Sequence, residues 1–211
     1  MAKKVEGELY ESLKRQLSEL GRQLRQEDGY SFDPVMLQNY LQNAIDGKFH
    51  IVDVVGKTFT RLISRGEVIT IDACDGSEIL ADADDIFAYI DPDLKNWDIN
   101  QRGLATKETL VEVHEIVDNA NFFQLFNSLS PDLRKICFTE NQIVGFAKKH
   151  RNWLRTDGCG TFFLFESNDK IFVANVYIDF KDDLCVGVFP FEHSSVWDAN
   201  DRRRLVAPQR A

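Results

Sequence analysis

The sequence predicts an α+β protein: an N-terminal helical hairpin, then a mixed region that ends in a helix and an antiparallel β-meander. Apolar residues recur at helical spacing over the first 47 residues, and from about residue 57 the pattern changes to short β-branched runs bounded by turn residues. Helices and strands are segregated, without βαβ alternation. We therefore expect a helical segment over residues 1–47 and an α+β domain over 48–211, which could divide again near residue 118.

The first predicted helix spans residues 5–26, and its leucines form one stripe. A second helix starts at Asp33, a good N-cap, and ends before Gly47. The short connection between them allows an antiparallel hairpin. The stripe either packs inside the protein or binds a partner. Coiled coils typically repeat the pattern for roughly three or four heptads, and this stripe lasts barely two, so internal packing is favoured. The partner-binding interpretation assigns Leu13, Leu17, Leu20 and Leu24, and the partner is then another protein or a second copy.

The central part of the chain alternates short strand and helix signals. Glu67–Asp72 reads as a strand, and the Asp75-Gly76 turn signal makes Ser77–Ala81 its returning partner in a hairpin. A short helix is expected at 83–90. The expected elements that follow are a strand over Thr109–Ile116, which alternates apolar and polar residues, and a helix over Asn119–Leu129.

The clearest local signal is a capping box, with Thr139 as N-cap and Gln142 three residues later. It starts a helix that we expect to reach about Leu154. A run of apolar residues over 162–165 indicates a strand that is covered on both faces. Short loops predict an antiparallel meander, and an edge strand limited by Pro208 is expected to follow. The three meander strands are Thr161–Glu166, Lys170–Asp179 and Leu184–Phe189, and the edge strand is Arg204–Ala207.

The acidity of the chain is local. The net charge is −9, and residues 67–98 hold ten acids and one base, so that segment alone carries a charge of −9. It could be a docking face for a basic partner or a divalent-cation site with Asp82, Asp84 and Asp85 as ligands. EF-hand spacing is absent, and turns, helix caps and a solvated face account for the same residues, which is the interpretation that we favour. An acidic surface also argues against nucleic-acid binding.

Two further groups invite a chemical interpretation. Arg202, Arg203 and Arg204 could bind an anionic ligand, although pairing with the acidic segment is simpler. Cys159, His193 and Asp198 could be drawn as a nucleophilic arrangement. The sequence shows neither a helix N-terminus nor an adjacent cation that would activate the thiol. Cys159 therefore reads as a turn residue that enters a strand.

Other function classes lack support in the sequence. The phosphate-binding, dinucleotide-binding and hydrolase glycine motifs are all missing, and no cofactor is predicted. No apolar run approaches the roughly 18 residues of a membrane span, and no signal-peptide core is visible. The four cysteines are widely spaced, which suits reduced thiols in the cytoplasm better than disulfides or a zinc site.

Several segments are similar to a group of uncharacterised bacterial proteins: TIDACDGSEILADADDIF, IDPDLKNW, WLRTDGCGTFFLF, IFVANVY and VWDANDRRRLVAPQ. In that group a tyrosine usually stands at the position of Cys159, which weakens the nucleophile hypothesis. The resemblance implies no activity. We therefore expect a binding or interaction protein, not an enzyme, that uses its acidic 67–98 face or its N-terminal helices. The alternative is a small metal-dependent hydrolase built on the Asp cluster.

Overall fold

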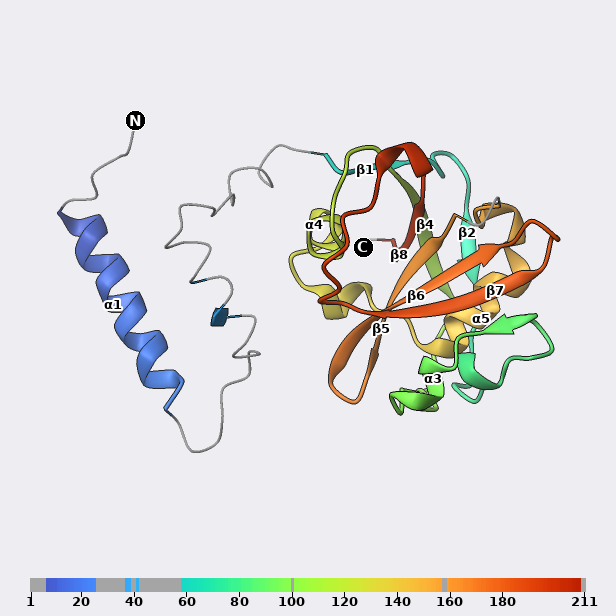
Figure 1. Ribbon diagram of the computed structural model, residues 1–211, viewed down its shortest axis with the longest axis horizontal. Coiled ribbons are helices and arrows are strands. Elements are labelled where there is room, and N and C mark those ends of the chain that lie inside the picture. The colour runs from blue at the N-terminus through green and yellow to red at the C-terminus, as the bar shows by residue number, and fades with distance from the viewer. Residues whose placement is uncertain are drawn as a thin grey trace. The chain divides into compact units, whose positions relative to one another are not determined.

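The computed structural model describes residues 7–25, 37–38, 41, 58–99, 101–156 and 159–209, and the chain divides into two compact units, residues 1–53 and 54–211 (Figure 1). The first unit contains helix α1, Glu8–Gln23, inside the span predicted for the first helix. Of the second predicted helix, residues 37, 38 and 41 are described, and all three are helical. The remainder of that helix, the hairpin connection and the expected boundary at residue 47 lie outside the described residues.

The second unit is built on one eight-stranded mixed sheet, which confirms the α+β class. Its strand order is β1-β4-β8-β5-β6-β7-β3, and β2 also pairs with β4. The β5–β8 and β3–β7 pairs are parallel, and the other pairs are antiparallel. The strands are β1 Thr60–Leu62, β2 Ile69–Ile71, β3 Tyr89–Ile90, β4 Thr109–Ile116, β5 Thr161–Ser167, β6 Lys170–Ile178, β7 Leu184–Pro190 and β8 Arg204–Pro208.

Strands β5, β6 and β7 form consecutive antiparallel pairs joined by tight turns. The β5–β6 turn places Asn168 and Asp169 at positive φ, 51° and 59°, a conformation that Asn and Asp tolerate better than most residues. Two-residue hairpin turns of this kind match the twist of the flanking strands. The polar residues between the strands therefore set the register that the sequence indicates.

Helices α4, Phe122–Leu129, and α5, Glu140–Lys149, pack on opposite faces of this sheet. Each begins with a capping box, in which the N-cap side chain accepts a backbone N–H three residues on and the side chain there bonds back. The box at Thr139 confirms the predicted helix start. The shorter helical elements are α3 Asp93–Asn96 and the 3₁₀ turns η2 Leu80–Asp82, η3 Leu133–Ile136, η4 Arg151–Trp153 and η5 Ala199–Asp201.

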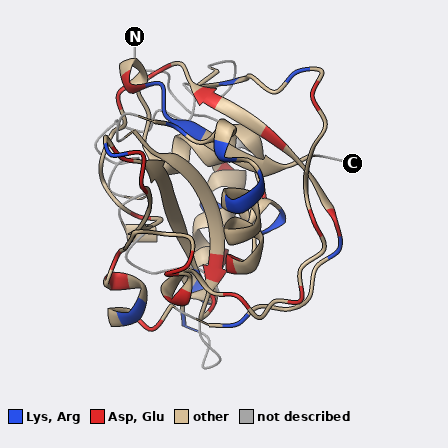
Figure 2. Ribbon diagram, turned by 90° about the vertical axis from the view of Figure 1, so that its right-hand side faces the viewer, with Lys and Arg blue, Asp and Glu red and all other residues tan. Residues whose placement is uncertain are grey.

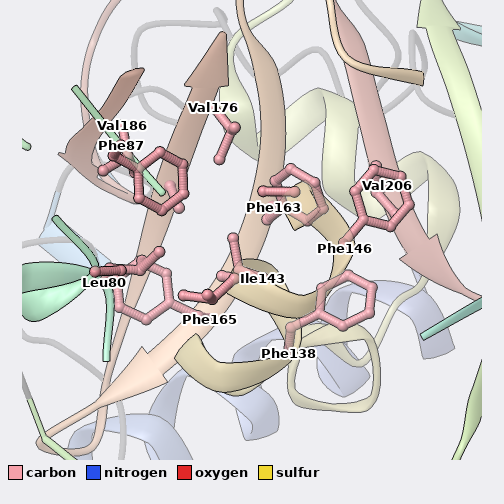
Figure 3. Close-up of a cluster of buried hydrophobic side chains, with 14 of the residues drawn as sticks. Leu80, Phe87, Phe138, Ile143, Phe146, Phe163, Phe165, Val176, Val186 and Val206 are labelled. Carbon is pink, nitrogen blue, oxygen red and sulfur yellow. The ribbon is translucent and has the colours of Figure 1, made fainter. Parts of the chain in front are cut away.

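The two faces of β5 explain its unbroken apolar sequence. Phe162 and Leu164 pack in the cluster under α4, whereas Phe163 and Phe165 pack in the cluster under α5, and all four are fully buried. In the α5 cluster, the ring centroid of Phe163 lies 5.2 Å from that of Phe146. Figure 3 shows Phe163, Phe165 and Phe146 of this cluster together with valines of β6, β7 and β8. The expectation that this strand is covered on both faces is confirmed.

Three predicted elements are wrong. The segment 77–81 is not a returning strand: β2 pairs with β4 instead, and residues 80–82 form η2. The expected helix at 83–90 is a set of turns followed by β3. The C-terminal strand β8 is not an edge strand, because it lies between β4 and β5 and its centre is buried. Pro208 is tolerated because it stands at the last position of the strand.

Candidate interaction surfaces and the predicted sites

The acidic segment is largely held by bonds within the protein. Asp72 pairs with Lys149 and Glu78 pairs with Lys148, both at 2.5 Å, so the basic C-terminal end of α5 lies beside this segment. Asp82 pairs with Lys95 at 3.0 Å. Figure 2 shows acidic and basic segments interspersed over this side of the second unit. The local excess of charge in the sequence is therefore not a uniform acidic face in space.

Other acids of the segment serve turns and helix starts. Asp75 accepts hydrogen bonds from the backbone N–H and the hydroxyl of Ser77, at 2.8 and 2.6 Å, which lowers the pKa of its carboxyl. Asp91 accepts from the backbone of Asp93 at 3.0 Å and from that of Val188 at 3.3 Å. Aspartate favours both roles because its short side chain reaches nearby backbone donors.

The predicted metal ligands do not form a metal site. Within the part of the chain that the structure describes, no group of three or more His, Cys, Asp or Glu side chains is placed to hold a metal ion. Asp82 is engaged with Lys95, and Asp84 and Asp85 are exposed at the turns before β3. Hard divalent cations need several oxygen ligands that converge, and these three carboxylates do not provide them.

The three C-terminal arginines point to different partners and do not converge. Arg202 is exposed at positive φ, 48°. The guanidinium of Arg203 lies 4.8 Å from the ring centroid of Trp197 and 3.1 Å from the carboxylate of Asp201. Arg204 donates to the carbonyl of Trp153 at 2.8 Å, and burial lowers the pKa of its guanidinium. The geometry is that of a packed strand end, and these three side chains do not form the convergent, unpaired set that the anion-binding interpretation requires.

The nucleophilic arrangement is likewise not assembled. The imidazole of His193 lies against Phe189, with ring centroids 5.1 Å apart, and its Nδ1 accepts the backbone N–H of Ser195 at 3.4 Å. Asp198 caps η5 through the N–H of Asn200. No hydrogen bond joins Cys159 to either of them among the described residues. The thiol therefore lacks the base that nucleophilic catalysis requires.

A strongly perturbed carboxyl among the described residues of the second unit escaped the sequence analysis. Glu140 is the first residue of α5, is only 5% exposed, and accepts the backbone N–H of Leu80 at 2.8 Å. Burial, with a smaller contribution from Asp82, raises the pKa of Glu140 to about 7. Its neighbours Asn141 and Gln142 are also buried and bond Gly76 and Thr109. The first turn of α5 is thus a polar anchor for the 76–80 segment. The capping box at Thr139 marks this first turn in the sequence and is the signal that could have pointed to Glu140.

Two pockets of the second unit meet at Glu112 on β4. One, of about 310 Å³, lies between residues 64–68 and β4, and the other, of about 200 Å³, lies between β4, β8 and Leu129. His114 lines the smaller pocket, with Nε2 3.5 Å from Glu112. The remaining lining residues of that pocket, Leu129, Ile136, Ala207 and Pro208, are apolar.

The leucine stripe of α1 is the predicted site whose side chains are exposed and available to a partner. Leu13, Leu17 and Leu24 are 43%, 60% and 43% exposed, and Leu20 is half-buried. Tyr10, which the sequence analysis left out of the stripe, continues it and is 52% exposed. A soluble helix normally buries such a stripe against another element. These residues therefore form the strongest candidate interaction surface of the described chain; we call it the α1 stripe.

Comparisons with protein-family models, with curated proteins and with solved structures find no match to this chain. The similarity to a group of uncharacterised bacterial proteins therefore stays a prediction. No described helix is both long enough and apolar enough to span a membrane.

Proposed function

We propose that this protein is a non-enzymatic binding protein and that the α1 stripe is its partner-binding surface. The observation that carries the proposal is the exposure of the stripe, whose large apolar side chains keep about half of their surface open in a helix of 16 residues. A single helix of this length is marginal in water without a surface to pack against. An exposed apolar stripe on such a helix is typical of helices that dock on another chain.

The arrangement of charge on the second unit supports α1 over the acidic segment as the binding element. Lys148, Lys149 and Lys95 already neutralise three of its acids, and two more bond backbone amides. A basic partner that binds these five acids would have to displace these contacts. The side chains of the α1 stripe carry no charge, so a partner that docks on them displaces no ion pair.

The alternative of a small metal-dependent hydrolase has less support. It requires carboxylates that converge on an ion and a group that activates water. Asp82, Asp84 and Asp85 do not converge, and the buried Glu140 is committed to the backbone of Leu80. The proposed binding function needs neither a metal nor a cofactor.

The proposal is tested by site-specific photo-crosslinking of the full chain in cells of its source organism. A photoreactive amino acid replaces Leu17 in one protein and Arg15, on the charged side of α1, in the matched control. We expect a discrete crosslinked product from position 17, identified by mass spectrometry, that is absent from position 15 and lost when Leu13→Glu is added. Equal labelling from both positions, or no product from either, would overturn the proposal.

A further inference from the structure

The α1 stripe follows a heptad repeat. Counting Tyr10 as position a places large apolar residues at every a and d position up to the end of the helix, with the alternating spacings of three and four that define a coiled-coil seam. We propose that the partner of α1 is a second copy of this chain, which packs along this seam as a two-stranded coiled coil. The inference rests on the proposed function and names the partner. The a positions are Tyr10, Leu17 and Leu24, and the d positions are Leu13 and Leu20.

The residues that flank the seam select a second copy over a charged partner. Positions e and g usually carry charges, which decide between partners through ion pairs or repulsion. In α1 these positions hold Leu9, Lys14, Gln16, Gly21 and Gln23, with one charge among the five. In a parallel pair, Gln16 of one copy faces Gly21 of the other. Two copies therefore meet without like-charge repulsion, and an oppositely charged partner would find almost nothing to pair with.

Three charged side chains of α1, those of Arg15, Glu19 and Arg22, lie away from the seam and bond to their own helix. The guanidinium of Arg22 pairs with both carboxylate oxygens of Glu19, at 2.7 and 2.8 Å, and Nε of Arg15 donates to the carbonyl of Glu11 at 3.3 Å. These four residues occupy the b, c and f positions, which face solvent in a coiled coil. The helix is thus polar on the outside and carries a single charge, that of Lys14, at its flanks. Only the seam is left to bury.

The test is sedimentation equilibrium of the purified full chain from low to high micromolar concentration. The test variant is Leu17→Glu, at an a position, and the matched control is Ser18→Glu, which adds the same charge at the neighbouring outward position. We expect a monomer–dimer equilibrium for the unchanged chain and for the control. The dimer of Leu17→Glu should dissociate at least about tenfold more readily, because each copy loses a buried leucine and gains a charge in the seam.

Thermal melts followed by tryptophan fluorescence accompany these measurements to show that the second unit of each variant folds. All three tryptophans lie within residues 54–211, so their emission reports on the second unit and not on α1. A chain that stays monomeric at every concentration overturns the second copy as partner, and so does a dimer that Leu17→Glu weakens no more than the control does. If the chain is monomeric but still crosslinks through position 17 to a different protein, the proposed binding function is supported and the inference that the partner is a second copy is wrong. If neither a dimer nor a crosslink is found, both the proposed function and the second copy as partner are wrong.

Discussion

Glu140 gives the protein a stability that depends on pH near neutrality. In the folded chain the pKa of this carboxyl is about 7, above the ordinary value of 4.5 that applies in the unfolded chain. The folded state therefore binds the proton of Glu140 more tightly than the unfolded state does. The protonated carboxyl stabilises the fold fully below pH 4.5, and this stabilisation is lost as the pH rises through 7. Each pKa unit corresponds to about 1.4 kcal/mol, so the loss amounts to about 3 kcal/mol.

The perturbation that isolates this effect is Glu140→Gln. A glutamine resembles the protonated acid: it keeps one oxygen to accept the N–H of Leu80 and carries no charge to bury. At about pH 5 we expect the variant and the unchanged protein to unfold at similar urea concentrations. At about pH 8 the variant should be the more stable, by up to about 3 kcal/mol. The backbone donors of Leu80 and Gln101 favour the carboxylate, and the pKa of about 7 is what remains after they have opposed the effect of burial.

The assay is urea unfolding followed by tryptophan fluorescence at several pH values between 5 and 8. The quantity of interest is the free energy of unfolding of the variant minus that of the unchanged protein at each pH, because other titrating groups cancel in the difference. A difference that stays constant over this range would refute the reasoning. It would mean that Glu140 is ionised in the folded chain throughout.

Three further predictions concern packing and the helix surface. Phe163→Ala should lower the free energy of unfolding by about 3–5 kcal/mol in the same urea assay, since the ring is fully buried against two other aromatic rings. Gly160→Ala should also lower the free energy of unfolding, because the added Cβ would overlap the side-chain oxygen of Asn175. Adding Asn175→Ala should restore part of that free energy, and fully additive losses in the double variant would contradict this reason. Gly21→Ala has open space around its Cβ, so it should favour the helix by about 1 kcal/mol and strengthen dimerisation in sedimentation, whereas weaker dimerisation would mean that the helices approach closely at that glycine.

Local signals predicted the parts of the fold that depend on neighbouring residues. The capping box at Thr139, the helical spacing over 119–129 and the polar turns of the meander each specify their own element, and the structure contains all three. The apolar run over 162–165 even indicated burial on both faces, because one strand cannot hide consecutive large residues otherwise.

The wrong predictions involve contacts between residues far apart in the chain. Asp75-Gly76 is a turn signal, and Gly76 does adopt φ 82°, but its N–H is bonded by Asn141 of α5 and the chain does not return along β2. Nothing near residue 80 indicates that β2 pairs with residues 109–111 instead. For the candidate site, the helical period located the α1 stripe, whereas only the structure could show that Lys148 and Lys149 pair with two acids of the acidic segment.

The position of β8 also bears on the order in which the second unit forms during synthesis. Strands β4 and β5 have no direct pairing in the sheet, because residues 204–208 lie between them. The ribosome makes these residues after every other strand of the described sheet, so the sheet stays in two separate parts until they emerge. Until residues 204–208 emerge, β4 and β5 lack the strand that joins them, so the core of the second unit cannot be completed before that point.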